Sequence, residues 1–329
     1  MIRATAPVRI CDIGGWTDTW FGGPGRVVHV AVRPGVEVTV EAGGGPGAVV
    51  IDVEDFGDRY SIVPGDPSRG RRHPLLEAAL DAVPPPDDIG AEIHVRSFVP
   101  PGSGLGTSAA IAVALLGALH ELRSDEPSPR ELAYGAHRLE VNVLGQESGI
   151  QDQLAAAFGG INFVEVEPYP EAKVRRLPDW PELAQCFTTV SLGRPHDSSA
   201  VHRQVIEDAR RRGPEVFEAL RQAALSARRA VVVQDAAAFG RAMLDGTDAQ
   251  RRLHPTLVSS DADEVFGRAN DHGAFGWKVN GAGGPGGSVT VLHPSSAARS
   301  AFEGALAGTP YRVLALEPSP SGLEVEGSL

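Results

Sequence analysis

The amino-acid sequence predicts an α+β protein, in which antiparallel strands and helices form packed layers. Residues 36–41 and 91–96 alternate apolar and polar side chains, which is the period of a half-buried strand. Apolar side chains at helical spacing predict a helix at about 108–122 and another after Pro129. Strands and helices do not alternate regularly along the chain, which favours α+β layers over a parallel sheet built from βαβ units.

The length of 329 residues fits one large domain or two of ordinary size. Prolines punctuate a loop-like stretch at 168–181, and a boundary there predicts domains 1–167 and 168–329. The remaining expected elements are strands at 161–167, 187–192, 276–280 and 288–293, helices at 199–212, 214–244 and 261–272, and a frayed tail or edge strand after residue 318.

Charge and composition argue against several classes of partner. The formal net charge is −12, and the chain lacks the basic stripe that is typical of nucleic-acid-binding domains. Its two cysteines are too few for a disulfide framework or a four-ligand metal site. The first residues lack the apolar run of a signal peptide, and no stretch reaches the roughly 18 apolar residues of a membrane span. We therefore expect a cytoplasmic protein that binds neither nucleic acid nor membrane.

A glycine-rich loop directly after the second predicted strand is the strongest functional signal. Gly102, Gly104 and Gly106 remove side chains at alternate positions, so backbone N–H groups can approach an anion closely. The helix that follows adds unpaired N–H groups and the positive end of its dipole, and Thr107 or Ser108 is expected to cap it. The alternative is a plain glycine turn. Thr107 stands where a Walker A motif has lysine and where the dinucleotide fingerprint has its last glycine, so neither motif fits.

Three segments, in the expected order, resemble the motifs of the GHMP kinases. Residues 101–110 are similar to the second motif, residues 6–10 with 14–19 to the first motif in its sugar-kinase form, and residues 278–284 to the third. The resemblance implies a two-domain α+β fold with mixed and antiparallel sheets and an active site between the domains. It also implies that ATP and Mg²⁺ bind. The implied nucleotide-binding residues are Pro101, Gly102, Ser103, Gly104, Leu105, Gly106, Thr107, Ser108, Gly281, Gly283 and Gly284.

Two residues depart from the family pattern, one inside the third segment and one directly after it. Pro285 interrupts the usual run of glycines and removes one N–H donor. Asn280 stands where a small apolar or hydroxyl residue is more usual.

A fourth stretch, residues 149–160, resembles the catalytic segment of galactokinase-like and heptose-kinase-like members. By that resemblance Asp152 is the catalytic aspartate, which accepts the proton of a sugar hydroxyl or orients that hydroxyl, and Arg9 lies beside it. The resemblance also implies that Ser108 and Glu140 bind Mg²⁺, with Glu147 as the rival ligand. Without the surrounding motif, Asp152 would be interpreted as a solvated loop carboxylate. The alternative for Glu140 is an exposed helix carboxylate.

The first motif bears on the acceptor. Residues 14–18 lack the Glu and His that galactokinases carry there, and they resemble the kinase domain of L-fucokinases, while residues 151–160 also suit heptose 7-phosphate kinases. Both groups phosphorylate the anomeric hydroxyl of a sugar. The implied substrate-binding residues are Gly15, Trp16, Asp18, Arg194 and His196. Alternatives remain: a core or lid role for Trp16, and a helix-capping role for the loop that contains Arg194 and His196.

The sequence therefore predicts an ATP- and Mg²⁺-dependent kinase for the C1 hydroxyl of a sugar or sugar phosphate, acting as a monomer or homodimer. One alternative is a GHMP kinase for a non-sugar alcohol, which the sugar-kinase form of the first motif disfavours. Another is a non-catalytic sugar sensor on the same scaffold. Such sensors tend to lose part of the catalytic set, whereas Arg9, Ser108, Glu140 and Asp152 are all present.

Overall fold

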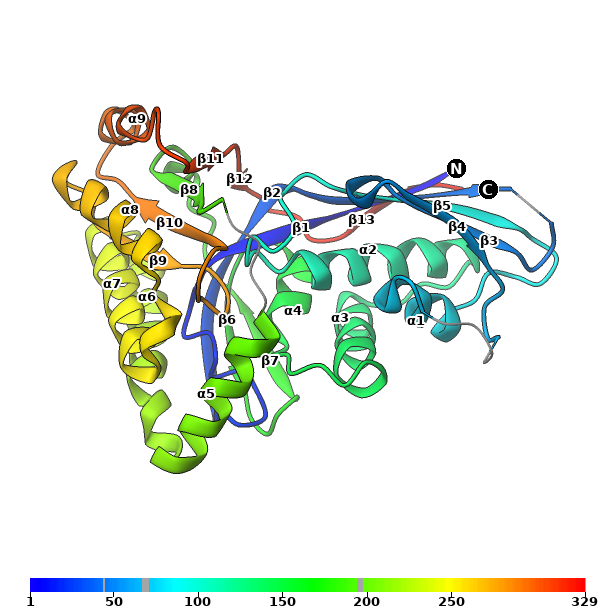
Figure 1. The fold of residues 1–329 in the computed structure, drawn as a ribbon, viewed down its shortest axis with the longest axis horizontal. Helices are drawn as coiled ribbons and strands as arrows, with labels where there is room; N and C mark the ends of the chain where they lie inside the picture. Colours follow the sequence, from blue (N-terminus) through cyan, green and yellow to red (C-terminus); the bar gives the residue numbers. More distant parts are fainter. Residues whose placement is uncertain (44, 67–70, 194–197, 329) are drawn as a thin grey trace.

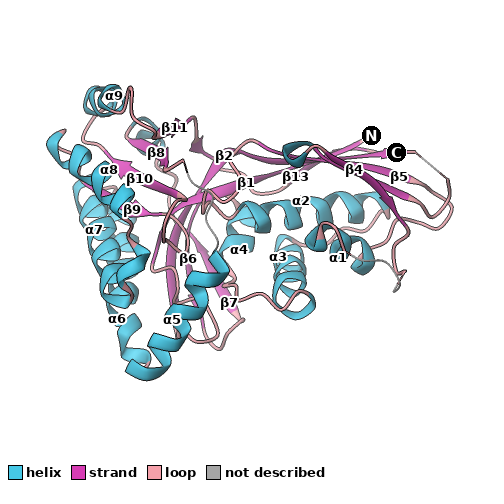
Figure 2. Cartoon of the chain, in the orientation of Figure 1, coloured by secondary structure: helices cyan, strands magenta, loops and turns pink. Residues whose placement is uncertain are grey.

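The structure, a computed structural model, describes residues 1–43, 45–66, 71–193 and 198–328. It confirms the α+β class, with helices packed on two sheets (Figures 1 and 2). Within the described residues, the first sheet has nine strands, with the core order β13-β1-β2-β5-β3-β4. The second has four strands in the order β11-β8-β10-β9.

Two long strands carry the first sheet. β1 (Ile2–Ile13) and β2 (Gly25–Ala42) pair antiparallel, and most of their side chains are buried because apolar residues occupy both faces. β2 also pairs with three other strands along its length, which makes it the centre of the sheet. The other strands are β3 (Val49–Val53), β4 (Asp58–Ile62), β5 (Ala91–Ser97), β6 (Ile161–Val166), β7 (Ala172–Arg176), β12 (Glu317–Pro318) and β13 (Glu324–Gly327).

Helices α1 (Pro74–Ala82), α2 (Thr107–Leu122), α3 (Pro129–Arg138) and α4 (Gln151–Phe158) gather on one face of this sheet (Figure 1). α2 is the innermost, since it packs on β1 and β2 as well as on α3 and α4. Its alanines and Gly117 let neighbours approach closely: a Cβ at Gly117 would lie 2.5 Å from Leu323. A π-helical turn, Leu139–Val143, continues α3 and carries Glu140.

The second sheet and its helices form the other part of the molecule. The strands are β8 (Phe187–Ser191), β9 (Gly276–Val279), β10 (Ser288–Leu292) and β11 (Arg312–Leu314). Their helices are α5 (Ser198–Arg212), α6 (Glu218–Val233), α7 (Ala236–Leu253), α8 (Ser260–Asp271) and α9 (Ser296–Ala305). Short 3₁₀ turns lie at Glu54–Phe56, Pro181–Gln185, Pro214–Phe217 and Pro255–Leu257. Of the described helices, none is long and apolar enough to cross a membrane.

Several expectations about local structure were wrong. The single helix expected at 214–244 is a 3₁₀ turn followed by α6 and α7, because Gln234 takes a left-handed conformation (φ 54°) and Asp235 caps α7 by accepting the N–H of Ala238. The loop expected at 168–181 contains β7, which pairs with β6. Neither Thr107 nor Ser108 caps α2, because the N-cap position belongs to Gly106.

The end of the described chain returns to the first sheet. β13 pairs with β1, so the tail is an edge strand, one of the two alternatives expected for it, and β12 pairs with β2. The first sheet therefore takes strands from both sides of the division proposed at residue 167. That division stays a prediction.

Two helical glycines give a matched test of packing between α7 and β9. A Cβ at Gly240 would lie 2.5 Å from the Phe275 carbonyl oxygen, whereas a Cβ at Gly267, exposed in α8, would meet nothing within 4 Å. We expect Gly240→Ala to lower the free energy of unfolding by about 2–4 kcal/mol, because backbone must move. Gly267→Ala should raise it by about 1 kcal/mol through helix propensity. Urea unfolding measures both, and equal effects would contradict the close approach.

Candidate active site

The segments singled out in the sequence meet around two adjoining cavities. One, of about 250 Å³, is lined by residues 102–109, which form the glycine-rich loop and the start of α2. The other, of about 80 Å³, is lined among others by Asp12 near the end of β1 and by residues of the segment 15–19, which follows that strand. The residues shared by both cavities are Arg9, Ser148, Asp152, His202, Gly281 and Ala282. A larger hollow of about 870 Å³ lies between α6 and α7, but none of the predicted site residues lines it.

The glycine-rich loop needs its glycines. Gly102, Gly104 and Gly106 have φ values of 69°, 71° and 75°, in the left-handed region that favours glycine. A Cβ at Gly104 would lie 2.9 Å from the Asn280 carbonyl oxygen, and one at Gly106 would lie 3.1 Å from Asp152 Oδ2. The loop is therefore pressed between the third glycine-rich segment and the predicted catalytic aspartate.

The same loop offers donors for an anion. The first N–H groups of α2 have no partner within the helix, because a helix pairs its N–H groups only with carbonyls of earlier turns. The buried Ser103 hydroxyl has no hydrogen-bond partner among the described residues. Together with the positive end of the helix dipole, these groups suit a phosphate.

Arg9 on β1 and Asp152 on α4 form a two-pronged ion pair. Arg9 Nε donates to Asp152 Oδ1 at 2.9 Å and Nη2 donates to Oδ2 at 3.0 Å. Arg9 Nη1 donates to the Gly104 carbonyl, and the Arg9 backbone N–H donates to the Leu105 carbonyl at 3.0 Å. Burial alone would lower the pKa of Arg9, but the neighbouring charges of Asp152 and Asp12 raise it overall. The guanidinium therefore stays charged where the strand, the loop and the aspartate meet.

A buried chain of hydrogen bonds reaches Asp152 from behind. Asn162 Nδ2 donates to His29 Nε2 at 3.2 Å, His29 Nδ1 donates to Gln151 Oε1 at 3.1 Å, and Gln151 Nε2 donates to Asp152 Oδ1. Burial lowers the pKa of His29 to about 4, so the ring is neutral, and the two neighbouring amides assign its tautomer. This chain holds the Asp152 carboxylate in one orientation. Its trace in the sequence is a pair of polar residues inside apolar strands, His29 and Asn162.

Glu140 is buried beneath the start of α2. Its Oε1 accepts the Ser108 hydroxyl at 2.8 Å, and its Oε2 accepts Ser148 Oγ at 3.0 Å and Gln153 Nε2 at 2.6 Å. Burial raises the pKa of Glu140, while these three donors act in the opposite direction. Glu140 is 4% exposed, so the alternative of an exposed helix carboxylate is wrong. Within the described chain no three His, Cys, Asp or Glu residues cluster as metal ligands.

Glu147 also lines the cavity of about 250 Å³ at the glycine-rich loop, but its carboxylate accepts the Trp20 indole N–H. Its backbone carbonyl contacts His202 Nδ1 at 2.6 Å. Mg²⁺ typically takes one or two carboxylates and completes its shell with phosphate and water. The pair of Ser108 and Glu140, already in contact, fits such an ion better than Glu147 does.

The smaller cavity is acidic and aromatic. Asp18 is buried, and its Oδ2 accepts the Gln151 backbone N–H at 3.1 Å. Burial raises the pKa of Asp18 to about 6. A Cβ at Gly149 would lie 2.0 Å from Asp18 Oδ2, so glycine is required there. Trp16, 5% exposed, is held at φ 79° with its ring edge-on to His202, with 4.8 Å between ring centroids.

Most predicted site residues line these cavities, and a few do not. Those that do are Arg9, Gly15, Trp16, Asp18, Gly102, Ser103, Gly104, Leu105, Gly106, Thr107, Ser108, Glu140, Asp152 and Gly281. Pro101 is exposed and outside the cavity linings, and Gly283 and Gly284 face the 3₁₀ turn Pro255–Leu257, where Gly284 N–H donates to the Leu257 carbonyl. Arg194 and His196 lie outside the described residues. Sequence reasoning missed the cavity-lining residues Asp12, Gln146, Ser148, Gln151 and His202.

Known proteins share these sequence features. The sequence model described as GHMP kinases N terminal domain matches residues 74–160. The mevalonate kinase of Pyrococcus furiosus is 31% identical over 243 residues, which cover 73% of this chain and 70% of that protein. The D-glycero-alpha-D-manno-heptose 7-phosphate kinase of Campylobacter jejuni is 26% identical over 214 residues, covering 63% of this chain and 62% of that protein.

A wider match and a solved structure extend the likeness to almost the whole chain. The bifunctional fucokinase/GDP-fucose pyrophosphorylase of Arabidopsis thaliana is 24% identical over 326 residues, which cover 90% of this chain but only 30% of that protein. The crystal structure described as a D-glycero-D-manno-heptose 1-phosphate kinase from Bacteriodes thetaiotaomicron superposes with a TM-score of 0.79 at 21% identity, covering 99% of each chain. Sequence, fold and the meeting of the three motifs agree: this chain belongs to the GHMP kinase family, whose members take a phosphoryl group from ATP, and it is a kinase with an alcohol group as acceptor.

Proposed function

We propose that this chain is an ATP- and Mg²⁺-dependent kinase that phosphorylates the anomeric C1 hydroxyl of a sugar or sugar phosphate. The observation that carries the proposal is the composition of the smaller cavity. Asp18 and Asp152 line it beside the indole of Trp16, whereas both oxygens of the third lining aspartate, Asp12, accept the Gly281 backbone N–H. Carboxylates accept hydrogen bonds from several hydroxyls at once, and an aromatic face packs on the apolar face of a pyranose. The likeness to kinases named for fucose and heptose supports the same substrate class.

The donor side follows from the loop. Backbone N–H groups of residues 102–108 and the Ser103 hydroxyl would hold phosphate oxygens at the start of α2. Ser108 and Glu140 would hold Mg²⁺, which neutralises phosphate charge when bound. Phosphoryl transfer depends on positioning and charge neutralisation more than on covalent help, and these groups provide both.

The acceptor side follows from Asp152, which lines both cavities. Its carboxylate would accept the proton of the attacking hydroxyl, or orient that hydroxyl towards the phosphate. The ion pair with Arg9 holds this carboxylate in place and brings positive charge next to the reacting centre. The choice of the anomeric hydroxyl rests on the sugar-kinase form of residues 14–19.

A non-sugar alcohol is the second candidate, because an archaeal mevalonate kinase is 31% identical to this chain. Mevalonate carries a carboxylate. Asp18, for which the described residues include no ion-pair partner, would repel that anion. Arg9, the arginine that lines this cavity, has all its side-chain nitrogens engaged with Asp152 and Gly104. The electrostatics therefore favour a hydroxyl-rich acceptor.

A coupled ADP-release assay tests the proposal over fucose, arabinose, galactose, mannose, glucuronate, heptose 7-phosphate and mevalonate. We expect ADP release with a sugar and not with mevalonate. Asp152→Asn should lower kcat by on the order of 10²–10⁴ with little change in ATP affinity. ADP release with mevalonate and with no sugar would show that the proposed acceptor is wrong and that the kinase assignment is right. Sugar binding without ADP release from any acceptor would support the sensor instead.

Asp18→Asn should move binding and stability in opposite directions. Because its folded pKa of about 6 lies above the unfolded value, Asp18 destabilises the folded state at pH 7.5. This effect shrinks as the pH falls below 6 and is lost only below the unfolded pKa of about 4. The variant should therefore be more stable by up to about 3 kcal/mol at pH 7.5, with a smaller difference at pH 5. Its KM for the acceptor should rise, since a carboxylate is lost. Urea unfolding and initial rates measure both, and a variant that is less stable at pH 7.5 would contradict the cause given for the pKa.

The magnesium assignment separates Glu140 from Glu147. Ser108→Ala and Glu140→Gln should each raise the Mg²⁺ concentration for half-maximal rate by about tenfold or more. Glu147→Gln serves as the matched control, because its carboxylate binds Trp20. A Mg²⁺ titration at saturating ATP measures all three. If only Glu147→Gln shifts the profile, the two glutamates exchange roles.

A further inference from the structure

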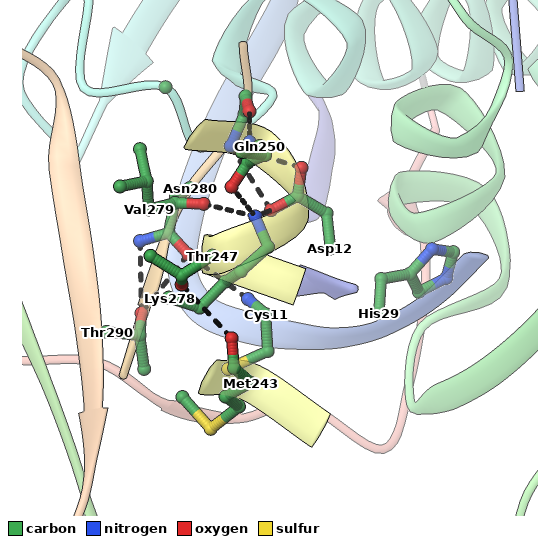
Figure 3. Close-up of polar contacts among 12 residues, drawn as sticks. Cys11, Asp12, His29, Met243, Thr247, Gln250, Lys278, Val279, Asn280 and Thr290 are labelled. Carbon is green, nitrogen blue, oxygen red and sulfur yellow. Dashed lines mark hydrogen bonds and ion pairs between the residues drawn. The ribbon is translucent and has the colours of Figure 1, made fainter. Parts of the chain in front are cut away.

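Lys278 on β9 is one of the largest fully buried side chains of the described residues, at 1% exposure. Figure 3 shows its ammonium group among Asp12, Gln250 and Val279. Nζ donates to Gln250 Oε1 at 2.9 Å and to the Val279 carbonyl, and it lies 3.5 Å from Asp12 Oδ1. Burial lowers the pKa of Lys278, and the charge of Asp12 opposes that effect. Burying an ion pair carries a large desolvation penalty, so a gain in stability does not by itself explain why Lys278 and Asp12 are buried together.

Asp12 and Gln250 grip the first glycine of the third segment from both sides. Asp12 Oδ1 and Oδ2 each accept the Gly281 backbone N–H at 3.2 Å. Gln250 Nε2 donates to the Gly281 carbonyl at 3.4 Å. Lys278 joins the two gripping side chains, because its ammonium contacts both. The Gly281 N–H is thereby directed at Asp12.

Gly281 in turn lies against the phosphate loop. A Cβ at Gly281 would lie 2.7 Å from the Gly104 carbonyl oxygen and 3.3 Å from Arg9 Nη2. The same Gly104 carbonyl accepts Arg9 Nη1, and Arg9 holds Asp152. A shift of Gly281 therefore reaches the loop directly, through the Gly104 carbonyl, and reaches Asp152 through Arg9.

A separate set of bonds fixes the strands without touching Gly281. Asn280 Oδ1 accepts the Cys11 backbone N–H at 3.1 Å, and Asn280 Nδ2 donates to Ser288 Oγ and Thr290 Oγ1, each at 3.0 Å. Ser288 Oγ donates to the Ser103 carbonyl at 2.7 Å. These bonds give the side chain of Asn280, a departure from the family pattern, a structural role, and they join β1, β9 and β10. The peptide N–H and carbonyl of Gly281 itself bond to Asp12 and Gln250 and not to this set.

We propose that Asp12, Lys278 and Gln250 form a clamp that sets Gly281 against Gly104, which makes Asp12 a positioning residue for phosphoryl transfer. Asp12 supplies the acceptor for the Gly281 N–H, and Lys278 holds that carboxylate in place and compensates its charge. The inference rests on the proposed role of the glycine-rich loop. It adds a residue whose effect on the reaction passes through the main chain of the third segment.

The test separates positioning from folding with a double variant. Asp12→Asn alone leaves the Lys278 cation buried and unpaired, so its Tm should fall. Asp12→Asn with Lys278→Met removes both charges and should recover most of that Tm, yet Gly281 still loses its anionic partner. We expect the double variant to show kcat reduced on the order of 10–100-fold, because small misplacements of reacting groups have effects of this size. The KM for the acceptor should change less than threefold.

Thr247→Val is the matched control. Thr247 lies one turn before Gln250 on α7, and its hydroxyl donates to the Met243 and Trp277 carbonyls at 3.0 and 2.9 Å, so it ties α7 to β9 without contacting Gly281. Two readouts need no acceptor: amide hydrogen exchange of residues 279–287 and the affinity for Mg-ATP. The double variant should exchange faster there and bind Mg-ATP more weakly, and Thr247→Val should do neither.

Three outcomes would overturn the clamp: unchanged exchange in residues 279–287, full recovery of kcat together with Tm in the double variant, or a loss confined to the KM for the acceptor, which would make Asp12 a substrate ligand. Failure of the proposed function is distinguishable. In that case the wild type releases no ADP with any sugar, while exchange and Mg-ATP affinity still report on the clamp.

Discussion

The ion pair between Arg9 and Asp152 is the contact on which the rest of the site depends. It joins the central strand pair of the first sheet to the helix that carries the predicted catalytic group, and it does so with two hydrogen bonds of fixed geometry. The remaining side-chain nitrogen of Arg9 donates to the Gly104 carbonyl, so one side chain fixes both Asp152 and the glycine-rich loop. A lysine could not reproduce this, because an ammonium group lacks the planar fork of donors.

The two sheets meet at this point, and their meeting explains why the fold is needed for the chemistry. β1 brings Arg9 and Asp12, α2 begins at the glycine-rich loop, and β9 leads into Gly281. Each segment approaches the next through a glycine, so main chain touches main chain. Such contacts do not yield by side-chain rotation. The packed layers therefore bring the segments together, and the side chains of Arg9 and Asp12 fix them there.

Sequence reasoning succeeded where the signal is local. The period of apolar residues after Thr107 found α2, and the alternating glycines found the loop, because both patterns lie within a few turns of chain. It failed where a pairing spans the chain: Lys278 lies 266 residues from Asp12, and no spacing rule links them. The break at Gln234 was missed because a left-handed residue that is not glycine leaves no mark in composition. The partnership of Arg9 with Asp152 was available only through family resemblance.

The proposed site binds one substrate mainly through the main chain and the other mainly through side chains. The donor side, at residues 102–108, consists largely of main-chain N–H groups and a helix terminus, which persist as long as the glycines keep their conformation. The acceptor side consists of side chains, among them Trp16 and Asp18. A substitution on the acceptor side alters which alcohol fits and leaves the phosphate cradle intact. Descendants of one ancestral kinase can thus exchange acceptors through a few point mutations while retaining the same nucleotide, since specificity is inherited in side chains and the phosphate chemistry in the backbone.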